Sequence, residues 1–142
     1  MKKKNVIILI LFVFLLTACT STDQPQQPEG CFENMPQSIP GLKVTGARSE
    51  KNVINNMWPV ICKARQVYQE RLKDNPKLIG TIELKLSVEF NGEIGPFSIT
   101  RKTIEDPVLE KRLLALIQFM DFDPNGPQNS ESEILLPIHF NP

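Results

Sequence analysis

The cysteines are the side chains of this sequence with the clearest chemistry, and there are three of them, at positions 19, 31 and 62. Cys19 comes after a lysine-rich start, an apolar run of 11 residues over 6–16, and the small residues Thr17 and Ala18. This order of charge, apolar stretch and small residues is typical of an export signal. We therefore expect Cys19 to be processed separately from the other two cysteines.

Leu16-Thr17-Ala18-Cys19 resembles a lipobox, the motif at which signal peptidase II cleaves before a cysteine whose sulfur carries diacylglycerol. The resemblance implies a lipoprotein signal peptide over residues 1–18 and a lipid anchor on Cys19, with about 0.8 kcal/mol of membrane affinity per buried methylene. The alternative is a retained membrane helix, but the apolar run of 11 residues is shorter than the roughly 20 that span a bilayer. Thr20 follows the cysteine, and a residue other than aspartate there favours the outer membrane in the proteobacterial sorting system that this motif resembles.

Cys31 and Cys62 remain once Cys19 is acylated. An exported protein enters an oxidising compartment, and an even number of remaining cysteines is suggestive of pairing. We predict a Cys31–Cys62 disulfide, which would contribute roughly 3 to 4 kcal/mol through the entropy of the unfolded chain. The alternative is one buried and one free thiol.

The remaining polar residues do not form a catalytic or metal-binding pattern. His139 is the one histidine, and no further ligands are placed near it, so we expect no metal and no cofactor. Glu131 and Glu133 alternate on a strand and lack the pocket that general acid–base catalysis needs. Without the lysines at positions 2–4, the chain keeps 13 basic against 16 acidic residues, which argues against nucleic acid as a partner. We therefore expect a protein that is not an enzyme.

Local patterns divide the mature chain into a polar tether over residues 19–30, an irregular arm over residues 31–48 and a folded domain over residues 49–142. The domain begins with apolar residues at three- and four-residue steps, which predict a helix over about 50–73 capped by Ser49. Pro59 either kinks this helix or marks its true first turn. Trp58 is expected to pack in the core or against the arm, with a partner-binding role as the alternative.

Period-two alternation over residues 82–90 predicts a strand with one buried face. Asn91-Gly92 suits a type I′ hairpin turn into a second strand through Phe97. Asp106 then caps a second helix that ends near Met120. A last alternating strand covers 133–140, and Pro137 within it predicts an edge strand because proline cannot donate to a ladder.

These elements predict a two-layer α+β domain in the order α-β-β-α-β, with a three-stranded antiparallel sheet and both helices on one face. The exposed edge of the last strand would recruit a protein partner by strand addition, flanked by Leu135 and His139 and blunted at Pro137. The alternative is that the arm, residues 31–48, covers this edge.

Residues 54–142 resemble the carboxyl-terminal domain of the TonB/TolA group, especially the version in AgmX/PglI-type gliding-motility proteins. The resemblance rests on the order and spacing of short pieces, which include the segment 68–76, Asn91-Gly92, Asp106-Pro107, Phe122-Asp123-Pro124 and the segment 136–140. It implies a non-enzymatic adaptor. We therefore expect an outer-membrane lipoprotein that faces the periplasm, is held to the membrane by its lipid, and joins protein partners in an envelope complex for motility, pili or secretion. The alternative is a free-standing ligand-binding or peptidoglycan-associated lipoprotein.

Overall fold

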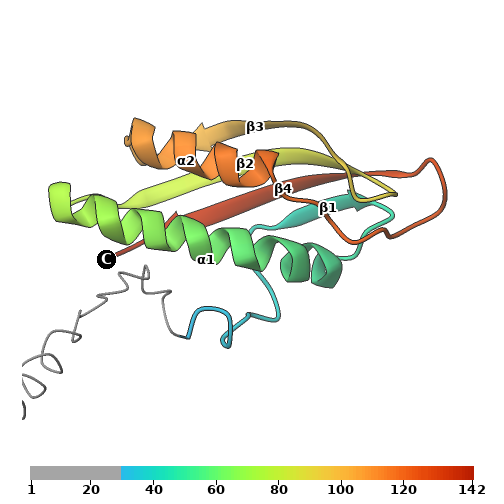
Figure 1. The fold of residues 1–142 in the computed structure, drawn as a ribbon, viewed down its shortest axis with the longest axis horizontal. Coiled ribbons are helices and arrows are strands. Elements are labelled where there is room, and N and C mark those ends of the chain that lie inside the picture. The colour runs from blue at the N-terminus through green and yellow to red at the C-terminus, as the bar shows by residue number, and fades with distance from the viewer. Residues whose placement is uncertain (1–29) are drawn as a thin grey trace, which may run out of the picture.

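The structure is a computed structural model that describes residues 30–142 (Figure 1). The expected signal peptide, Cys19 and the tether up to residue 29 lie outside these residues. Along the chain, the elements are β1 (Lys43–Gly46), α1 (Glu50–Asp74), β2 (Gly80–Glu89), β3 (Ile94–Lys102), α2 (Pro107–Gln118) and β4 (Glu131–Phe140). The fold is α+β, as predicted, with both helices on one face of an antiparallel sheet (Figure 1). Neither helix within 30–142 is long and apolar enough to cross a membrane.

The sheet has four strands in the order β1-β4-β2-β3, so the prediction of three strands is wrong. The additional strand, β1, lies within the arm, which is therefore not irregular throughout. It pairs with β4 from Lys43 opposite Leu135 to Gly46 opposite Ser132. The last strand is thus an inner strand over this stretch, and the prediction of an exposed edge there is also wrong. The alternative, in which the arm covers that edge, is the one that the structure adopts.

Both helices begin where the sequence places them. Ser49 accepts a hydrogen bond from the backbone N–H of Asn52 and caps α1, and Pro59 lies inside this helix rather than in its first turn. Asp106 accepts from the N–H of Leu109 at 2.9 Å, with Pro107 at the first helical position of α2. A missing proline N–H costs nothing there, because the first-turn donors have no partner within the helix.

The hairpin between β2 and β3 does not use the predicted type I′ turn. Gly92 has a φ of +96°, but Asn91 does not take a positive φ as that turn requires. Instead, the N–H of Glu89 bonds to the carbonyl of Glu93 at 3.0 Å, which leaves a three-residue loop that ends in a left-handed glycine. Gly92 also packs so closely against the carbonyl of Phe122 that a side chain at position 92 would collide with it.

The core lies between the helices and one face of the sheet. Alternate residues of β2 and β4 are 0–2% exposed on this face, as the period-two patterns predict. The hydroxyl of Tyr68 on α1 donates at 2.6 Å to the carbonyl of Leu78, which ties the end of α1 to the start of β2. The strand residues that form this face are Ile82, Leu84, Leu86, Val88, Ile134, Leu136, Ile138 and Phe140.

Candidate functional site

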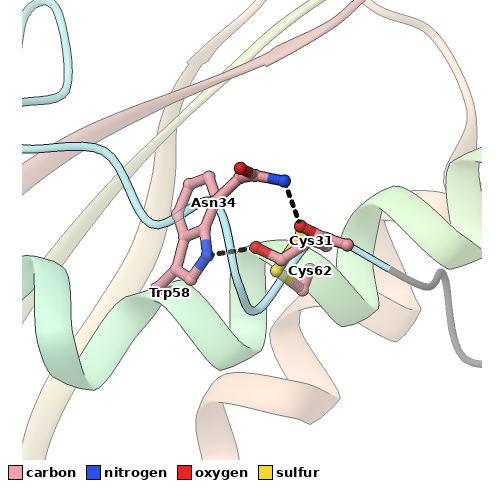
Figure 2. Close-up of a disulfide and its surroundings, with 5 residues drawn as sticks. Cys31, Asn34, Trp58 and Cys62 are labelled. Carbon is pink, nitrogen blue, oxygen red and sulfur yellow. Dashed lines mark hydrogen bonds between the residues drawn. A yellow bond between two sulfur atoms is a disulfide. The ribbon is translucent and has the colours of Figure 1, made fainter.

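The beginning of the arm is fixed to α1 by a disulfide. Cys31 and Cys62 are bonded, with their Cα atoms 5.9 Å apart, which confirms the predicted pair (Figure 2). One helical turn before Cys62, the indole Nε1 of Trp58 donates a 2.7 Å hydrogen bond to the carbonyl of Cys31. Trp58 is 6% exposed, and the guanidinium of Arg65 lies 5.2 Å from its ring. Trp58 therefore packs against the arm, as the first of its two sequence-based interpretations predicts, and little of it is open to a partner.

The arm then crosses to the side of the sheet that the helices leave open. Gly41 has a φ of +82°, and a Cβ at this position would lie 3.0 Å from the ring of Pro137. Glycine is the residue that allows both this backbone conformation and this close approach. Pro137 is buried as a result, although its side chain belongs to the sheet face opposite the core.

Pro137 occupies an inner strand without breaking the ladder. The carbonyl of Thr81 accepts a 2.9 Å hydrogen bond from the chain just beyond β3, so the backbone of β2 points toward β3 at this residue. Successive residues of an antiparallel strand alternate in direction, so Ile82 points toward β4, where it pairs with Ile138. The nitrogen of Pro137 then points to the β1 side, where pairing with β1 ends at Leu135. The missing N–H thus falls beyond the last β1 partner.

A groove of about 480 Å³ runs across this open face, from the arm over β4 and β2 to β3. We call it the sheet groove. Its volume lies in the range of about 300–1,000 Å³ that is typical of ligand pockets. The predicted partner-binding residues Leu135, Pro137 and His139 all line it, whereas Trp58 does not. The full lining consists of Pro40, Gly41, Lys43, Thr81, Glu83, Arg101, Thr103, Leu135, Pro137 and His139.

Of the two basic side chains that line the sheet groove, Arg101 has an acidic partner and Lys43 has none among residues 30–142. Arg101 forms an ion pair of 2.9 Å with Glu83, whose side chain is only 14% exposed. His139 is exposed, and its Nδ1 lies 2.9 Å from the hydroxyl of Thr81. Lys43, by contrast, has no ion pair or side-chain hydrogen bond with any residue in 30–142. The groove therefore carries one unpaired positive charge at the arm end.

β3 is an edge strand with an open outer side, since no strand among residues 30–142 pairs with it there. In β3, Phe97 is paired with Leu86 of β2, and Ile99 is paired with Leu84. Because backbone direction alternates along a strand, the N–H and C=O groups of Leu84 and Leu86 point toward β4 and not toward β3. The N–H and C=O groups of Phe97 and Ile99 consequently point outward from the sheet. β1 is the other edge, but it has only four residues.

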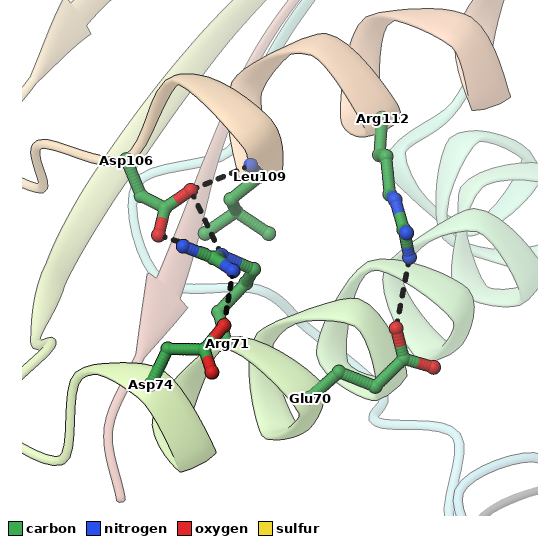
Figure 3. A network of polar contacts seen from close by, with 6 residues as sticks. All are labelled: Glu70, Arg71, Asp74, Asp106, Leu109 and Arg112. Atoms are coloured by element: carbon green, nitrogen blue, oxygen red, sulfur yellow. Dashed lines mark hydrogen bonds and ion pairs between the residues drawn. The ribbon is translucent and has the colours of Figure 1, made fainter.

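A polar network holds α2 against α1 (Figure 3). Arg71 on α1 pairs through its Nε with Asp106 at 3.0 Å and through Nη1 with Asp74 at 2.5 Å. Burial by itself would raise the pKa of Asp106, but the N–H of Leu109 and the guanidinium of Arg71 stabilise the charged form and hold the pKa below its ordinary value. Outside this network, Arg112 pairs with Glu70 at 2.8 Å on the exposed side of the helices.

Sequence reasoning missed Arg48, which closes the end of the domain distant from Arg71. Arg48 is 4% exposed, and its guanidinium donates to the carbonyls of Glu89 and Asp123, each at 2.8 Å, and to the side chain of Asn52 at 2.9 Å. Burial lowers the pKa of Arg48, and the nearby carboxylate of Asp123 opposes that shift. No local signal identifies this residue, because two of its three partners, Glu89 and Asp123, come from distant segments of the chain.

Among residues 30–142, no three His, Cys, Asp or Glu side chains gather as a metal-binding group. The chain matches no family model, no curated protein and no solved structure. The proposals that follow rest on the open β3 edge, the sheet groove and the arm that the disulfide fixes to α1.

Proposed function

We propose that this protein is an outer-membrane lipoprotein that acts as a non-enzymatic periplasmic adaptor and binds a protein partner by strand addition at the edge of β3. The partner would belong to an envelope-spanning complex of the motility, pilus or secretion type. The domain itself would be a variant of the TonB/TolA carboxyl-terminal type, in which the order α1-β2-β3-α2-β4 is kept and β1 is added from the arm. The open edge of β3 is the observation that carries the proposal.

An extended segment of a partner gains main-chain hydrogen bonds when it pairs with unpaired N–H and C=O groups of an edge strand. Phe97 and Ile99 offer such groups, and their side chains are half-buried against the core, which anchors this part of the edge. Pro96 and the charged Arg101 flank the stretch. Proline and charge at an edge limit unselective pairing with other copies. The edge thus suits a chosen partner rather than general aggregation.

The expected lipid anchor and the disulfide would serve the same role. Acyl chains on Cys19 would hold the protein at the membrane, and the tether of residues 19–30 would reach about 37 Å at roughly 3.1 Å per residue. The disulfide connects the end of this tether directly to α1. A partner bound at β3 would therefore be joined to the membrane through the folded domain rather than through a loose arm.

The experiment is recovery of partners from detergent-solubilised membranes with the full-length chain carrying Ile99→Pro, compared with Ile99→Ala. Ile99→Ala removes most of the isoleucine side chain but keeps the backbone N–H, whereas proline removes the outward N–H that an added strand would need. We expect Ile99→Ala to recover the partners of the wild type and Ile99→Pro to lose them, while circular dichroism shows that both variants are folded.

Ser98→Pro serves as the folding control, because Ser98 faces Lys85 within the ladder and a proline there should destabilise the domain itself. Undiminished recovery with a folded Ile99→Pro variant would contradict strand addition at β3. The binding surface would then lie elsewhere, with the groove between α1 and α2 beside the 85% exposed Phe119 as the next surface to test.

A further inference from the structure

The sheet groove has the charge and lining of a second contact surface, separate from the β3 edge. We propose that it binds an extended, acidic segment of a protein partner, with a carboxylate of that segment paired to Lys43. This inference rests on the proposed adaptor function and specifies the chemistry of the partner. It also accounts for Leu135, Pro137 and His139, which strand addition at β3 does not use.

Charge complementarity favours a carboxylate as the occupant. The other cations of this face have carboxylate partners, since Lys85 pairs with Glu133 at 2.8 Å and Arg101 pairs with Glu83 at 2.9 Å. Lys43 alone on the rim of the groove lacks such a partner among the described residues. Opposite charge across an interface gives specificity and suppresses wrong partners. A segment that brings one carboxylate therefore completes the pairing on this face, whereas a basic segment would be repelled.

The rest of the lining favours a peptide over a small ion. Leu135, Pro40 and Pro137 give the groove an apolar floor and wall, and a volume of about 480 Å³ has room for several atoms beyond a carboxylate. Thr81 and Thr103 add hydroxyl groups at the β3 end. Apolar contacts together with a few placed polar groups are typical of peptide and ligand sites.

The arm forms one wall of the sheet groove, and this part of the chain is held in place at both of its ends. Gly41 lies tight against Pro137, and Lys43 begins the pairing with β4 opposite Leu135. At its other end, the arm is bonded to α1 through Cys31. A wall that is ordered before binding loses little conformational entropy when a ligand arrives. The groove is thus preformed rather than created by the partner.

The test uses full-length protein in detergent and fluorescein-labelled heptapeptide pools whose central residue is Glu, Gln or Lys, flanked by mixtures of Ala, Val, Thr and Pro. Fluorescence anisotropy measures binding. We expect the Glu pool to bind about threefold to fivefold more tightly than the Gln pool, as one solvent-accessible ion pair allows. This preference should shrink in high salt, because exposed charges are screened.

Lys43→Gln should abolish the preference for Glu, and Lys43→Glu should shift it toward the Lys pool. Lys111→Gln removes an exposed lysine from α2 on the helical side and should leave the preference intact. The charge-reversal variant keeps the test valid even if one substitution weakens binding generally.

Equal binding of the Glu and Gln pools, or a Glu preference that survives Lys43→Gln, would overturn the inference. Soluble peptidoglycan fragments that bind in place of the Glu pool would also overturn it and assign the groove to the cell wall.

The two proposals fail separately. Partner recovery with Ile99→Pro reports on the β3 edge, whereas the difference between the Glu and Gln pools reports on the sheet groove. Loss of recovery without any Glu preference would leave the adaptor proposal in place and remove the groove from it. A Glu preference together with undiminished recovery would place partner binding at the groove instead of the edge.

Discussion

The indole Nε1 of Trp58 donates a 2.7 Å hydrogen bond to the carbonyl of Cys31, the residue whose sulfur is bonded to Cys62. The two contacts reach α1 on successive turns, so the start of the arm is held at two points of one helix (Figure 2). The arm continues from there into β1, which fills the edge of the sheet beside β4. The disulfide therefore fixes to α1 the start of the segment that also supplies the edge strand β1.

We predict that replacing Cys31 and Cys62 together by alanine lowers the free energy of unfolding by roughly 3 to 4 kcal/mol, since the cross-link closes a loop across 31 positions of the chain. Urea unfolding followed by the fluorescence of Trp58, the one tryptophan of the protein, measures this loss. Wild-type protein treated with a thiol reductant is the matched control and should unfold at nearly the same urea concentration as the variant. An unchanged midpoint in both would show that the disulfide does not stabilise the domain.

A second prediction concerns Arg48. Arg48→Met keeps much of the side-chain volume but leaves the carbonyls of Glu89 and Asp123 without their donor at a partly buried site. Each such group costs about 1–3 kcal/mol, so we expect a loss of roughly 3 kcal/mol in unfolding free energy.

Arg65→Met is the matched control for Arg48→Met, because Arg65 is exposed, lies over the face of Trp58 and forms no ion pair in the described structure. A loss of about 0.5–1 kcal/mol is expected there from the cation–π contact. Equal losses in the two variants would mean that the buried hydrogen bonds of Arg48 add nothing to stability.

The helix starts could be read from the sequence because their signals are local. Ser49 and Asp106 cap the helices through hydrogen bonds to residues three positions later, and Pro107 takes the one helical position that tolerates it. The strands β2 and β4 were also predictable from alternating apolar and polar residues, since one face of each strand is buried along its length. The two-layer arrangement of the helices and the central strands follows from these patterns.

β1 could not be predicted because nothing local distinguishes it. It has four residues, and Val44 is the only one that is even half-buried. Its extended form depends on pairing with β4, which lies about 90 positions further along the chain. Pro137 wrongly indicated an edge strand, because a proline excludes a backbone hydrogen bond on one side of a strand and at one position only. The sheet groove likewise depends on the contact between Gly41 and Pro137, which no spacing in the sequence reveals.

A third prediction is lipidation at Cys19. Cells grown with labelled palmitate should incorporate label into the wild-type protein, and the protein should fractionate with the outer membrane. Cys19→Ser should lose both the label and the membrane association, because no thiol remains in the lipobox-like motif. Cys31→Ser is the matched control and should keep the label, since it removes a cysteine outside that motif. Equal labelling of the wild type and Cys19→Ser would disprove the anchor.

The last prediction is an acid-dependent loss of stability through Asp106. Arg71 and the N–H of Leu109 hold the pKa of Asp106 below its ordinary value in the folded protein, although burial alone would raise it. A carboxyl group whose pKa is lower in the folded than in the unfolded protein stabilises the fold at any pH above its unfolded pKa, which is about 3.9 for aspartate. This stabilisation is lost as the pH falls from the unfolded pKa through the folded pKa. Asp106→Asn keeps an oxygen for the cap but removes the charge, so it should cost about 1–2 kcal/mol at pH 7. Urea unfolding at pH 7 and pH 3 should show that the difference in unfolding free energy between wild type and Asp106→Asn is smaller at the lower pH.

Asp121→Asn is the matched control, because it removes an exposed carboxylate that has no ion pair in the described structure. A difference between wild type and Asp106→Asn that stays constant over this range would show that the ion pair with Arg71 does not stabilise the fold.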